Sequence, residues 1–274
     1  FISPHYSLKA KKGWFFFDKE YICLGAGITS NTDRAVVTTL NQCHLKGDVT
    51  VSAGNGTDVL NKGEHHWSGI EWISHDNVGY VFSEPQKISL LNAEASGSWY
   101  SINHQTSSSK ELIKEDVFKL WVEHGERPTD ATYSYVVLPA ADQEQILAYV
   151  KQPTIRILSN TVALQAVEHM EKGCVYAICY QGGTLSLGAR RGMIEMDSSG
   201  MLMAHYDRTG KLINLAVSDP SRHLAKLHLS IQGKLQSTSD SVSCSYDVST
   251  DRTNLAITLP QGGYAGSSVQ IFFN

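Results

Sequence analysis

The fold of this chain is decided by the stretch WISHDNVGYVF at residues 72–82. Aromatic and β-branched residues stand on either side of a short polar centre, Asp76-Asn77. β-branched and aromatic residues favour strands, whereas Asp and Asn favour turns because their side chains bond nearby backbone amides. The stretch therefore predicts two paired strands joined by a tight turn. A second segment, FKLWVEHGERP at residues 118–128, ends in a similar His-Gly turn and is followed by a further apolar strand, YSYVVLP at 133–139.

The same alternation of apolar and polar residues dominates the rest of the chain, and it predicts an all-β protein. Segments 14–24, 99–103 and 193–204 each read as one strand. One short helix is predicted, with Asp142 as its N-cap and an apolar face within residues 145–150. Many short strands, each with one face to bury, indicate antiparallel sheets stacked face to face.

A domain boundary is predicted at residues 151–154, KQPT, just past the helix. Pro153 cannot donate to a β-ladder and restricts the residue before it, so a strand is not expected to run through this point. We expect residues 1–152 to form a multi-sheet antiparallel β-sandwich that lacks its own N-terminal part. Residues 153–274 are expected to form a smaller, C-terminal β-sandwich.

The composition of the chain limits the kinds of partner that it is expected to bind. The 274 residues are 42% hydrophobic and 18% charged, as in a globular protein, and the formal net charge is −4 with no block of like charges. A nucleic-acid surface needs clustered Lys and Arg, so none is expected. No apolar run approaches the roughly 20 residues that span a bilayer, so no membrane contact is expected either. The N-terminal residues show no signal-peptide pattern.

No cofactor or metal site is predicted. The five cysteines are dispersed, without a Cys-x-x-Cys pair or a Cys/His cluster. Cys174 and Cys179 lie an odd number of residues apart on one predicted strand, so their side chains point to opposite faces and cannot bridge. We interpret all five cysteines as buried free thiols.

Two clusters are candidate substrate-binding sites. In the first, Trp67 could stack on a sugar while His65 or His66 bonds a hydroxyl; the alternative is an exposed loop anchored by the Trp. Adjacent His side chains on a strand diverge, so they are poorly placed to share one metal. The second is Arg190-Arg191, the only adjacent Arg pair, which stands beside Gly192 in a predicted turn and could bind an anion. His75 and His124 both border turns, and we interpret them as structural rather than catalytic.

The segments AKKGWFFFDKE (10–20) and CLGAGI (23–28), together with 72–82 and 118–139, closely resemble the β half of the family 8 polysaccharide lyases. The likeness is greatest to the chondroitin AC lyase branch. It implies a helical toroid followed by antiparallel β sheets, and cleavage of acidic polysaccharides by β-elimination at the uronic acid. The family's catalytic Asn, Tyr, His and Arg lie upstream, in the toroid and its junction with the β region, so no catalytic residue is assigned to this chain.

Two functions stay open at this stage. The resemblance implies the C-terminal β portion of a glycosaminoglycan lyase, with an acidic polysaccharide and an upstream helical domain of the same protein as partners. It also implies an extracytoplasmic location, periplasmic, secreted or surface-held, because polymer substrates lie outside the cell. The alternative is a non-catalytic carbohydrate-binding or structural β-sandwich module. The sequence does not distinguish chondroitin from hyaluronan.

The cysteine pattern generates a direct test. Titration of the denatured, unreduced protein with a thiol reagent should count five thiols, because a domain of this size does not need covalent crosslinks to fold. A reduced sample is the control and should give the same count. A count of three or one would show a disulfide and contradict the interpretation.

Overall fold

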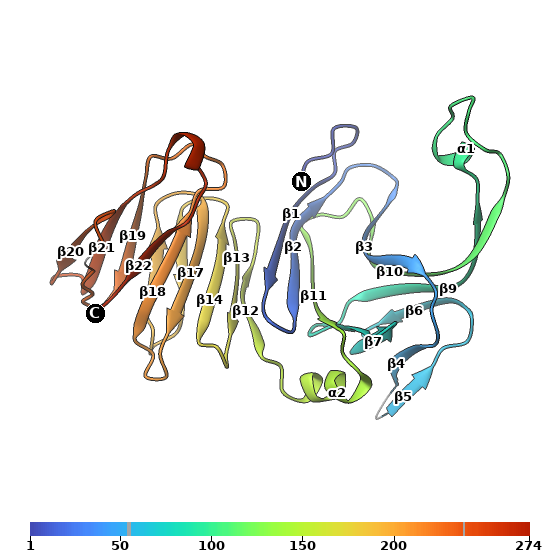
Figure 1. Ribbon diagram of the computed structural model, residues 1–274, viewed down its shortest axis with the longest axis horizontal. Helices are drawn as coiled ribbons and strands as arrows, with labels where there is room; N and C mark the ends of the chain where they lie inside the picture. Colours follow the sequence, from blue (N-terminus) through green and yellow to red (C-terminus); the bar gives the residue numbers. More distant parts are fainter. Residues whose placement is uncertain (54–55, 238) are drawn as a thin grey trace. The chain divides into compact units, whose positions relative to one another are not determined.

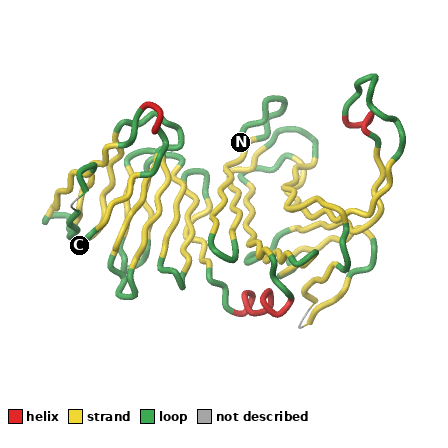
Figure 2. The backbone as a smooth tube through the Cα atoms, viewed as in Figure 1, coloured by secondary structure: helices red, strands yellow, loops and turns green. Residues whose placement is uncertain are grey.

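The computed structural model describes residues 1–53, 56–237 and 239–274, and strands make up most of it (Figures 1 and 2). The chain separates into two compact units. The first contains residues 1–23 and 27–152, and the second contains residues 24–26 and 153–274. Every strand pairing with a described register is antiparallel, including those that build the two sheets of the second unit. The predicted all-β class, a multi-sheet antiparallel β-sandwich followed by a C-terminal β-sandwich, is confirmed.

The first unit contains a seven-stranded and a four-stranded sheet. In spatial order the larger sheet is β1 (Lys9–Phe16), β2 (Tyr21–Thr29), β11 (Ala131–Pro139), β8 (Val78–Val81), β7 (Trp72–His75), β4 (Val49–Ala53) and β5 (Gly56–Val59). The smaller sheet is β3 (Ala35–His44), β10 (Ile113–Glu126), β9 (Lys87–Gly97) and β6 (Gly63–Ser68). Ile73 of the larger sheet and Phe118, Leu120 and Leu90 of the smaller one belong to one buried apolar cluster, each 0% exposed. Burial of these side chains away from water is the main term that holds the two sheets together.

The hairpin predicted at residues 72–82 is confirmed. Strands β7 and β8 pair from Trp72 opposite Val81 to His75 opposite Val78. Asp76 and Asn77 form the two-residue turn, with φ angles of 51° and 59°. Two consecutive positive φ values are typical of a type I′ turn, whose twist matches that of the strands it joins.

Three predicted strands were wrong in extent or type. Segment 99–103 is the helix α1 (Trp99–Ile102), because the side chains of Ser98 and Ser101 each bond the other's backbone amide in a capping box. Segment 14–24 is divided between β1 and β2, where Phe17 N donates to Glu20 O at 2.9 Å. Segment 193–204 is divided by the turn at residues 197–199. In each case local hydrogen bonds in a turn or cap interrupt the apolar alternation.

The predicted short helix is confirmed as α2 (Gln143–Lys151). Its N-cap Asp142 accepts a hydrogen bond from Gln145 N at 2.8 Å, and the Gln145 side chain accepts one from Asp142 N at 2.9 Å. Ile146 is the buried residue of the helix, and its side chain packs towards Gly79 of β8.

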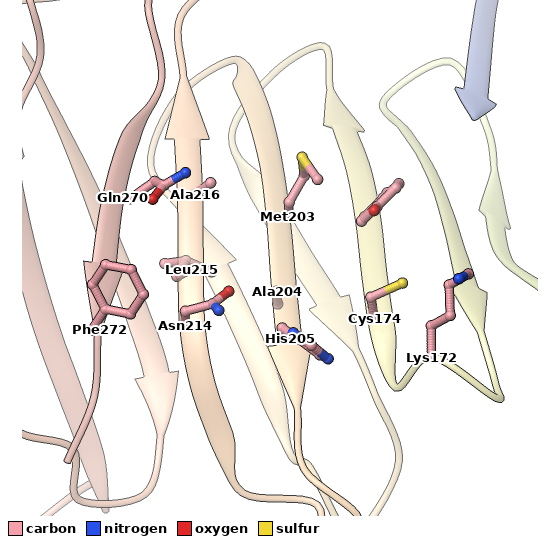
Figure 3. A pocket seen from close by; sticks show the side chains of 11 residues that line it. Lys172, Cys174, Met203, Ala204, His205, Asn214, Leu215, Ala216, Gln270 and Phe272 are labelled. Atoms are coloured by element: carbon pink, nitrogen blue, oxygen red, sulfur yellow. The ribbon is translucent and has the colours of Figure 1, made fainter. Parts of the chain in front are cut away.

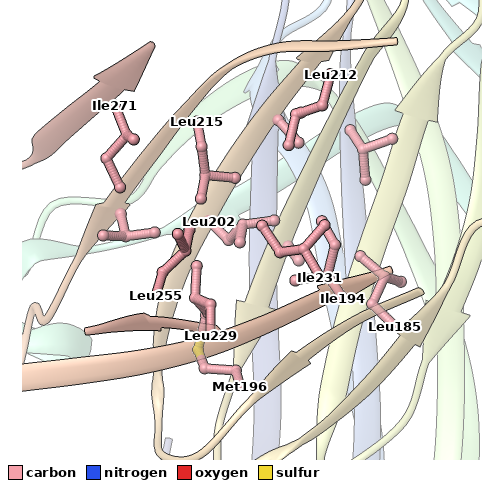
Figure 4. Close-up of a cluster of buried hydrophobic side chains, with 14 of the residues drawn as sticks. Leu185, Ile194, Met196, Leu202, Leu212, Leu215, Leu229, Ile231, Leu255 and Ile271 are labelled. Atoms are coloured by element: carbon pink, nitrogen blue, oxygen red, sulfur yellow. The ribbon is translucent and has the colours of Figure 1, made fainter. Parts of the chain in front are cut away.

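The second unit is a sandwich of a six-stranded and a five-stranded sheet. The larger sheet is β12 (Ile155–Asn160), β13 (Leu164–His169), β14 (Cys174–Cys179), β17 (Gly200–Tyr206), β18 (Leu212–Ser218) and β22 (Val269–Phe272). The smaller is β15 (Gly183–Ser186), β16 (Met193–Met196), β19 (Lys226–Gln232), β21 (Arg252–Thr258) and β20 (Val242–Asp247), and a 3₁₀ turn (Gly262–Tyr264) precedes β22. Leu202 and Leu215 from one sheet meet Leu229 and Leu255 from the other in a closed apolar core (Figure 4).

Packing, and not disulfide bonds, stabilises the described part of this fold. All five cysteines lie in the described part of the chain and none is in a disulfide. Cys244 is exposed and Cys43 is half-buried, so the interpretation of all five as buried was wrong. Burial raises the pKa of Cys23 to about 11, so this thiol stays protonated at neutral pH.

No helix of the described residues has the length and apolar character to cross a membrane.

The contact between α2 and β8 generates a stability prediction. A Cβ at Gly79 would lie 2.7 Å from Cγ1 of Ile146, whose side chain is fully buried. We expect Gly79→Ala to lower the free energy of unfolding by about 1–3 kcal/mol through overpacking. Gly97→Ala is the matched control, because no atom lies within 4 Å of its Cβ position. Urea denaturation of both variants checks this, and equal stability of the two would contradict the packing argument.

Candidate functional site

The His-His-Trp candidate lies on β6, the edge strand of the four-stranded sheet. Residues His65 to Trp67 pair with β9, so the alternative interpretation as an exposed loop was wrong. The two His side chains point to opposite faces, as expected for strand neighbours. On one face, His65 stacks on Trp67 with ring centroids 5.8 Å apart, and its Nε2 lies 2.9 Å from Asn61 O.

On the other face, His66 belongs to a polar cluster on three adjacent strands. Its Nδ1 lies 2.7 Å from Oγ of Ser89 on β9, and that hydroxyl donates to Oε1 of Glu123 on β10 at 2.5 Å. Glu64 is 3.6 Å from the other ring nitrogen of His66. The strand register produces this grouping, because Ser89 is opposite both His66 and Trp121 on its two neighbouring strands.

This cluster has the residue types of a hydrolytic triad without its arrangement. In a triad the His accepts the Ser proton and the carboxylate holds the other ring nitrogen. Here the Ser89 hydroxyl is directed to Glu123, and Ser89 is only 1% exposed. The proton needed for activation already has a carboxylate acceptor, so the cluster is better suited to holding three strands in register than to nucleophilic chemistry.

His75 is buried in the interior of the first unit. Its Nε2 accepts a hydrogen bond from Lys46 N at 3.0 Å, and its ring stacks on Phe118 with centroids 4.2 Å apart. Burial lowers the pKa of this imidazole below its ordinary value. Asp76 belongs to the turn and lies 3.4 Å from the Lys46 ammonium. These contacts support the structural role predicted for His75.

His124 is also held as a structural group. It lies within β10, which continues to Glu126, so the His-Gly turn predicted here was wrong. Gly125, with φ 74°, marks a shift in register against β3 instead. Nε2 of His124 lies 2.8 Å from Thr38 Oγ1 across the sheet, and its ring packs near that of Tyr133. Burial, with the nearby positive charge of Lys12 as a second cause, lowers the pKa of His124 to about 4. The side chain is therefore neutral near pH 7 and bonds its neighbour without carrying charge.

The Arg pair lies between β15 and β16 in the second unit. Arg190 donates from Nε to Thr209 O at 3.0 Å and from Nη2 to Arg208 O at 2.7 Å, which ties its turn to the neighbouring turn. Arg191 donates to Oε1 of Glu168 at 2.5 Å and lies over the ring of Tyr206, 4.7 Å from its centroid.

Two carboxylates of the second unit, Glu168 and Glu195, have Arg partners. Glu168 is 5% exposed and bonds both Arg156 and Arg191. A buried carboxylate normally needs such compensation, because desolvation of an unpaired charge is costly. Glu195 is half exposed and bonds Arg252, with 2.6 Å between Oε2 and Nη1. Both carboxylates therefore link strands of the second unit.

Sequence reasoning missed Ser89, Glu123, Glu168 and Tyr206 as members of these clusters. Ser89 and Glu123 reach His66 from strands 23 and 57 residues further along the chain. Tyr206 lies in an ordinary alternating strand and gives no local signal. Within residues 1–53, 56–237 and 239–274, no group of three or more His, Cys, Asp or Glu is placed to hold a metal ion.

The outer face of the six-stranded sheet has a shallow groove of about 430 Å³ (Figure 3). His205, Asn214 and Phe272 form one row across three neighbouring strands, and Met203 lies in the adjacent row. Phe272 is 59% exposed. An exposed ring beside amide and imidazole groups can contact both the apolar face and the hydroxyls of a sugar.

A second, more polar groove of about 350 Å³ lies on the outer face of the five-stranded sheet. Its lining includes Ser230, Asn254 and the pair formed by His228 and Asp197, whose Nδ1 and Oδ2 are 2.7 Å apart. The His228 and Asp197 side chains are both about half exposed, so this ion pair is of low energetic weight.

Comparison with known proteins places this β architecture among the polysaccharide lyases. Residues 1–150 match the model of the polysaccharide lyase family 8 super-sandwich domain, and residues 156–228 match that of the family's C-terminal β-sandwich domain. The chain belongs to polysaccharide lyase family 8 and forms a C-terminal portion of such a lyase.

Among its relatives, chondroitinase-AC of Pedobacter heparinus is 38% identical over 270 residues, which cover 97% of this chain and 35% of that protein. Hyaluronate lyase HylB of Enterococcus faecalis is 29% identical, over 97% of this chain and 26% of its own length. A structure of chondroitinase AC lyase, from a study of its oligosaccharide complexes, superposes with a TM-score of 0.81 at 37% identity, over 96% of this chain and 36% of that chain. The chain thus spans between about a quarter and about a third of the length of these relatives.

The environment of His124 generates a pH prediction. An unfolded His124 takes up a proton below about pH 6.5, whereas the folded side chain resists protonation until about pH 4. Its contribution to stability is therefore complete above pH 6.5 and is lost as the pH falls from 6.5 to 4. We expect His124→Gln to reduce the loss of stability between pH 7 and pH 5 by about 1 kcal/mol, allowing for partial exposure.

Urea unfolding of both proteins at pH 7 and pH 5 measures this difference. His104→Gln, in the exposed segment after α1, is the control and should leave the pH dependence unchanged. An identical slope for the parent and His124→Gln would show that His124 titrates normally in the folded protein.

Proposed function

We propose that this chain is the β portion of a lyase that cleaves a glycosaminoglycan of the chondroitin or hyaluronan class by β-elimination. The observation that carries the proposal is continuous similarity to chondroitinase-AC along 97% of this chain, covering only 35% of that enzyme. In this proposal the remaining two thirds, upstream in the parent protein, supply the helical catalytic domain.

β-Elimination needs three groups held together. One must neutralise the uronate carboxylate, a base must remove the C5 proton, and an acid must protonate the leaving oxygen. In this chain His75 and His124 are committed to internal contacts, and His66 is bonded to Ser89 and flanked by carboxylates. These contacts favour a chain that acts as a scaffold and adds one wall to a catalytic cleft formed with the upstream domain.

The proposal also includes a location and a substrate range. Glycosaminoglycans are too large to enter a cell unaided, so we propose that the parent protein acts outside the cytoplasm. Two relatives that are similar over 97% of this chain are named chondroitinase-AC and hyaluronate lyase, which supports chondroitin and hyaluronan as the first substrates to test.

The groove on the six-stranded sheet supports a second candidate, a carbohydrate-binding module without catalysis. The exposed Phe272 and the half-buried Asn214 lie side by side there, and a sugar could stack on the ring while bonding the amide. In this alternative the chain binds glycans whether or not an active catalytic domain accompanies it.

Ultraviolet absorbance of the unsaturated uronate product distinguishes the two functions. We expect the full-length parent protein to release this product from chondroitin or hyaluronan, and the 274-residue chain alone to release none. The chain should remain inactive because His66, His75 and His124 already have structural partners.

Two outcomes would contradict the proposal. Product from the isolated chain would place a catalytic group within these residues. No product from the full-length protein on either polymer, with glycan binding retained, would favour the binding module.

A further inference from the structure

A small cavity opens at one end of the second sandwich. Turns 187–192 and 207–211 and the segment 232–235 that follows β19 converge on a volume of about 240 Å³. Its lining includes Arg190, Arg191, Lys211, Tyr206 and Gln232. Loops clustered at the end of a β-sandwich are a common place for ligand binding, because the sheets hold them rigidly.

Positive charge is in excess around this cavity. Arg156 and Arg191 share the single carboxylate of Glu168. Arg190 bonds only backbone carbonyls, while Lys211 and Arg208 stand on the adjacent turn with Asp207. Of the residues that line the cavity, Arg190, Arg191 and Lys211 are cationic and none is acidic. Because a guanidinium has five N–H donors, both lining Arg side chains retain donors beyond the bonds described.

A buried hydroxyl lies in the same lining. Tyr206 is 4% exposed, and its OH has no hydrogen-bond partner among the described residues. Burial raises the pKa of this phenol well above its ordinary value, so the group stays protonated and can act as a donor. A buried donor without a protein partner is uncommon, and in native proteins such a group is normally satisfied by water or by a bound group.

The backbone of the cavity is closely packed against its side chains. Gly210 has φ 86°, and a Cβ there would lie 2.9 Å from Nε of Arg190. Gly192 has φ 70°, and a Cβ there would lie 2.5 Å from Oε1 of Gln232. Two glycines therefore let the turns approach closely enough to hold Arg190 and Gln232 in place.

From this arrangement we infer that the cavity is an anion-binding subsite that takes a sulfate ester or carboxylate of an acidic polysaccharide. Arg190, Arg191 and Lys211 supply the charge, and Tyr206 supplies a hydroxyl donor. The identity of the polymer rests on the proposed function. The subsite lies wholly within the second unit and would anchor the glycan without taking part in its cleavage.

Isothermal titration calorimetry on the 274-residue chain tests this inference. The ligands are octasaccharides of equal length from chondroitin sulfate, unsulfated chondroitin and hyaluronan, with inorganic sulfate as a fourth. We expect Arg190→Gln combined with Lys211→Gln to weaken octasaccharide binding about tenfold or more, because charge-assisted bonds are lost. Lys211→Gln alone, at an exposed position, should give a smaller loss and stands in if the double variant does not fold.

Tyr206→Phe is the sharpest variant. It removes only the hydroxyl, so the thermal midpoint should stay the same or rise, while octasaccharide affinity should fall about threefold to tenfold. A purely structural role for Tyr206 would leave affinity unchanged. Lys226→Gln, at the opposite end of β19 from Gln232, removes the same charge away from the cavity and should change affinity less than about twofold.

The titrations distinguish a sulfate subsite from a carboxylate subsite and from no subsite. Binding of chondroitin sulfate alone supports a sulfate subsite, and equal binding of all three octasaccharides supports a carboxylate subsite. Parent-like affinity in the cavity variants, or binding of inorganic sulfate only, would overturn the inference. The elimination assay on the full-length protein is independent, so loss of the subsite with activity retained would leave the proposed function standing.

Discussion

The first unit depends on the burial of Phe118 between its two sheets. Phe118 comes from β10 at the centre of the four-stranded sheet, and it stacks on His75 and lies against Tyr80 of the β7–β8 hairpin. The polar groups brought inside with these rings are satisfied: His75 accepts from Lys46 N, and Asn41 donates to the Tyr80 hydroxyl at 2.7 Å. Buried polar groups are tolerated only when bonded in this way. Loss of the Phe118 ring would therefore also remove the support for two polar contacts that fix the hairpin.

The same requirement governs three of the eleven histidines of the chain. His75 is buried and His124 is partly buried, and burial favours the neutral ring of both. His66 stays on the outer face, but the hydroxyl that it meets is already bonded to Glu123. Each imidazole links strands that are distant in sequence. This use of histidine suits the scaffold role that we propose for the chain.

The second unit contains a buried charge, the carboxylate of Glu168. Glu168 lies on an inner strand with two Arg partners, and one of these, Arg191, also covers Tyr206. An interior carboxylate therefore gathers positive charge at one end of an otherwise apolar sandwich. The anion-binding subsite that we infer follows from this surplus, because two guanidinium groups share one carboxylate while Arg190 and Lys211 lie beside them.

The sequence by itself determined the strand-rich class, the β7–β8 hairpin with its Asp76-Asn77 turn and the capped helix at Asp142, because each depends on residues adjacent in the chain. Alternation failed where local bonds intervened, as at Ser98 and Ser101, where a capping box starts a helix inside an apolar pattern. The candidates His66 and Arg191 were visible in the sequence, but their partners were not. Ser89, Glu123 and Glu168 reach them through pairing and sandwich closure, which join residues between 23 and 57 positions apart. Only the tertiary structure decided whether a polar side chain was free for a ligand or already engaged, because strand register and burial select its neighbours.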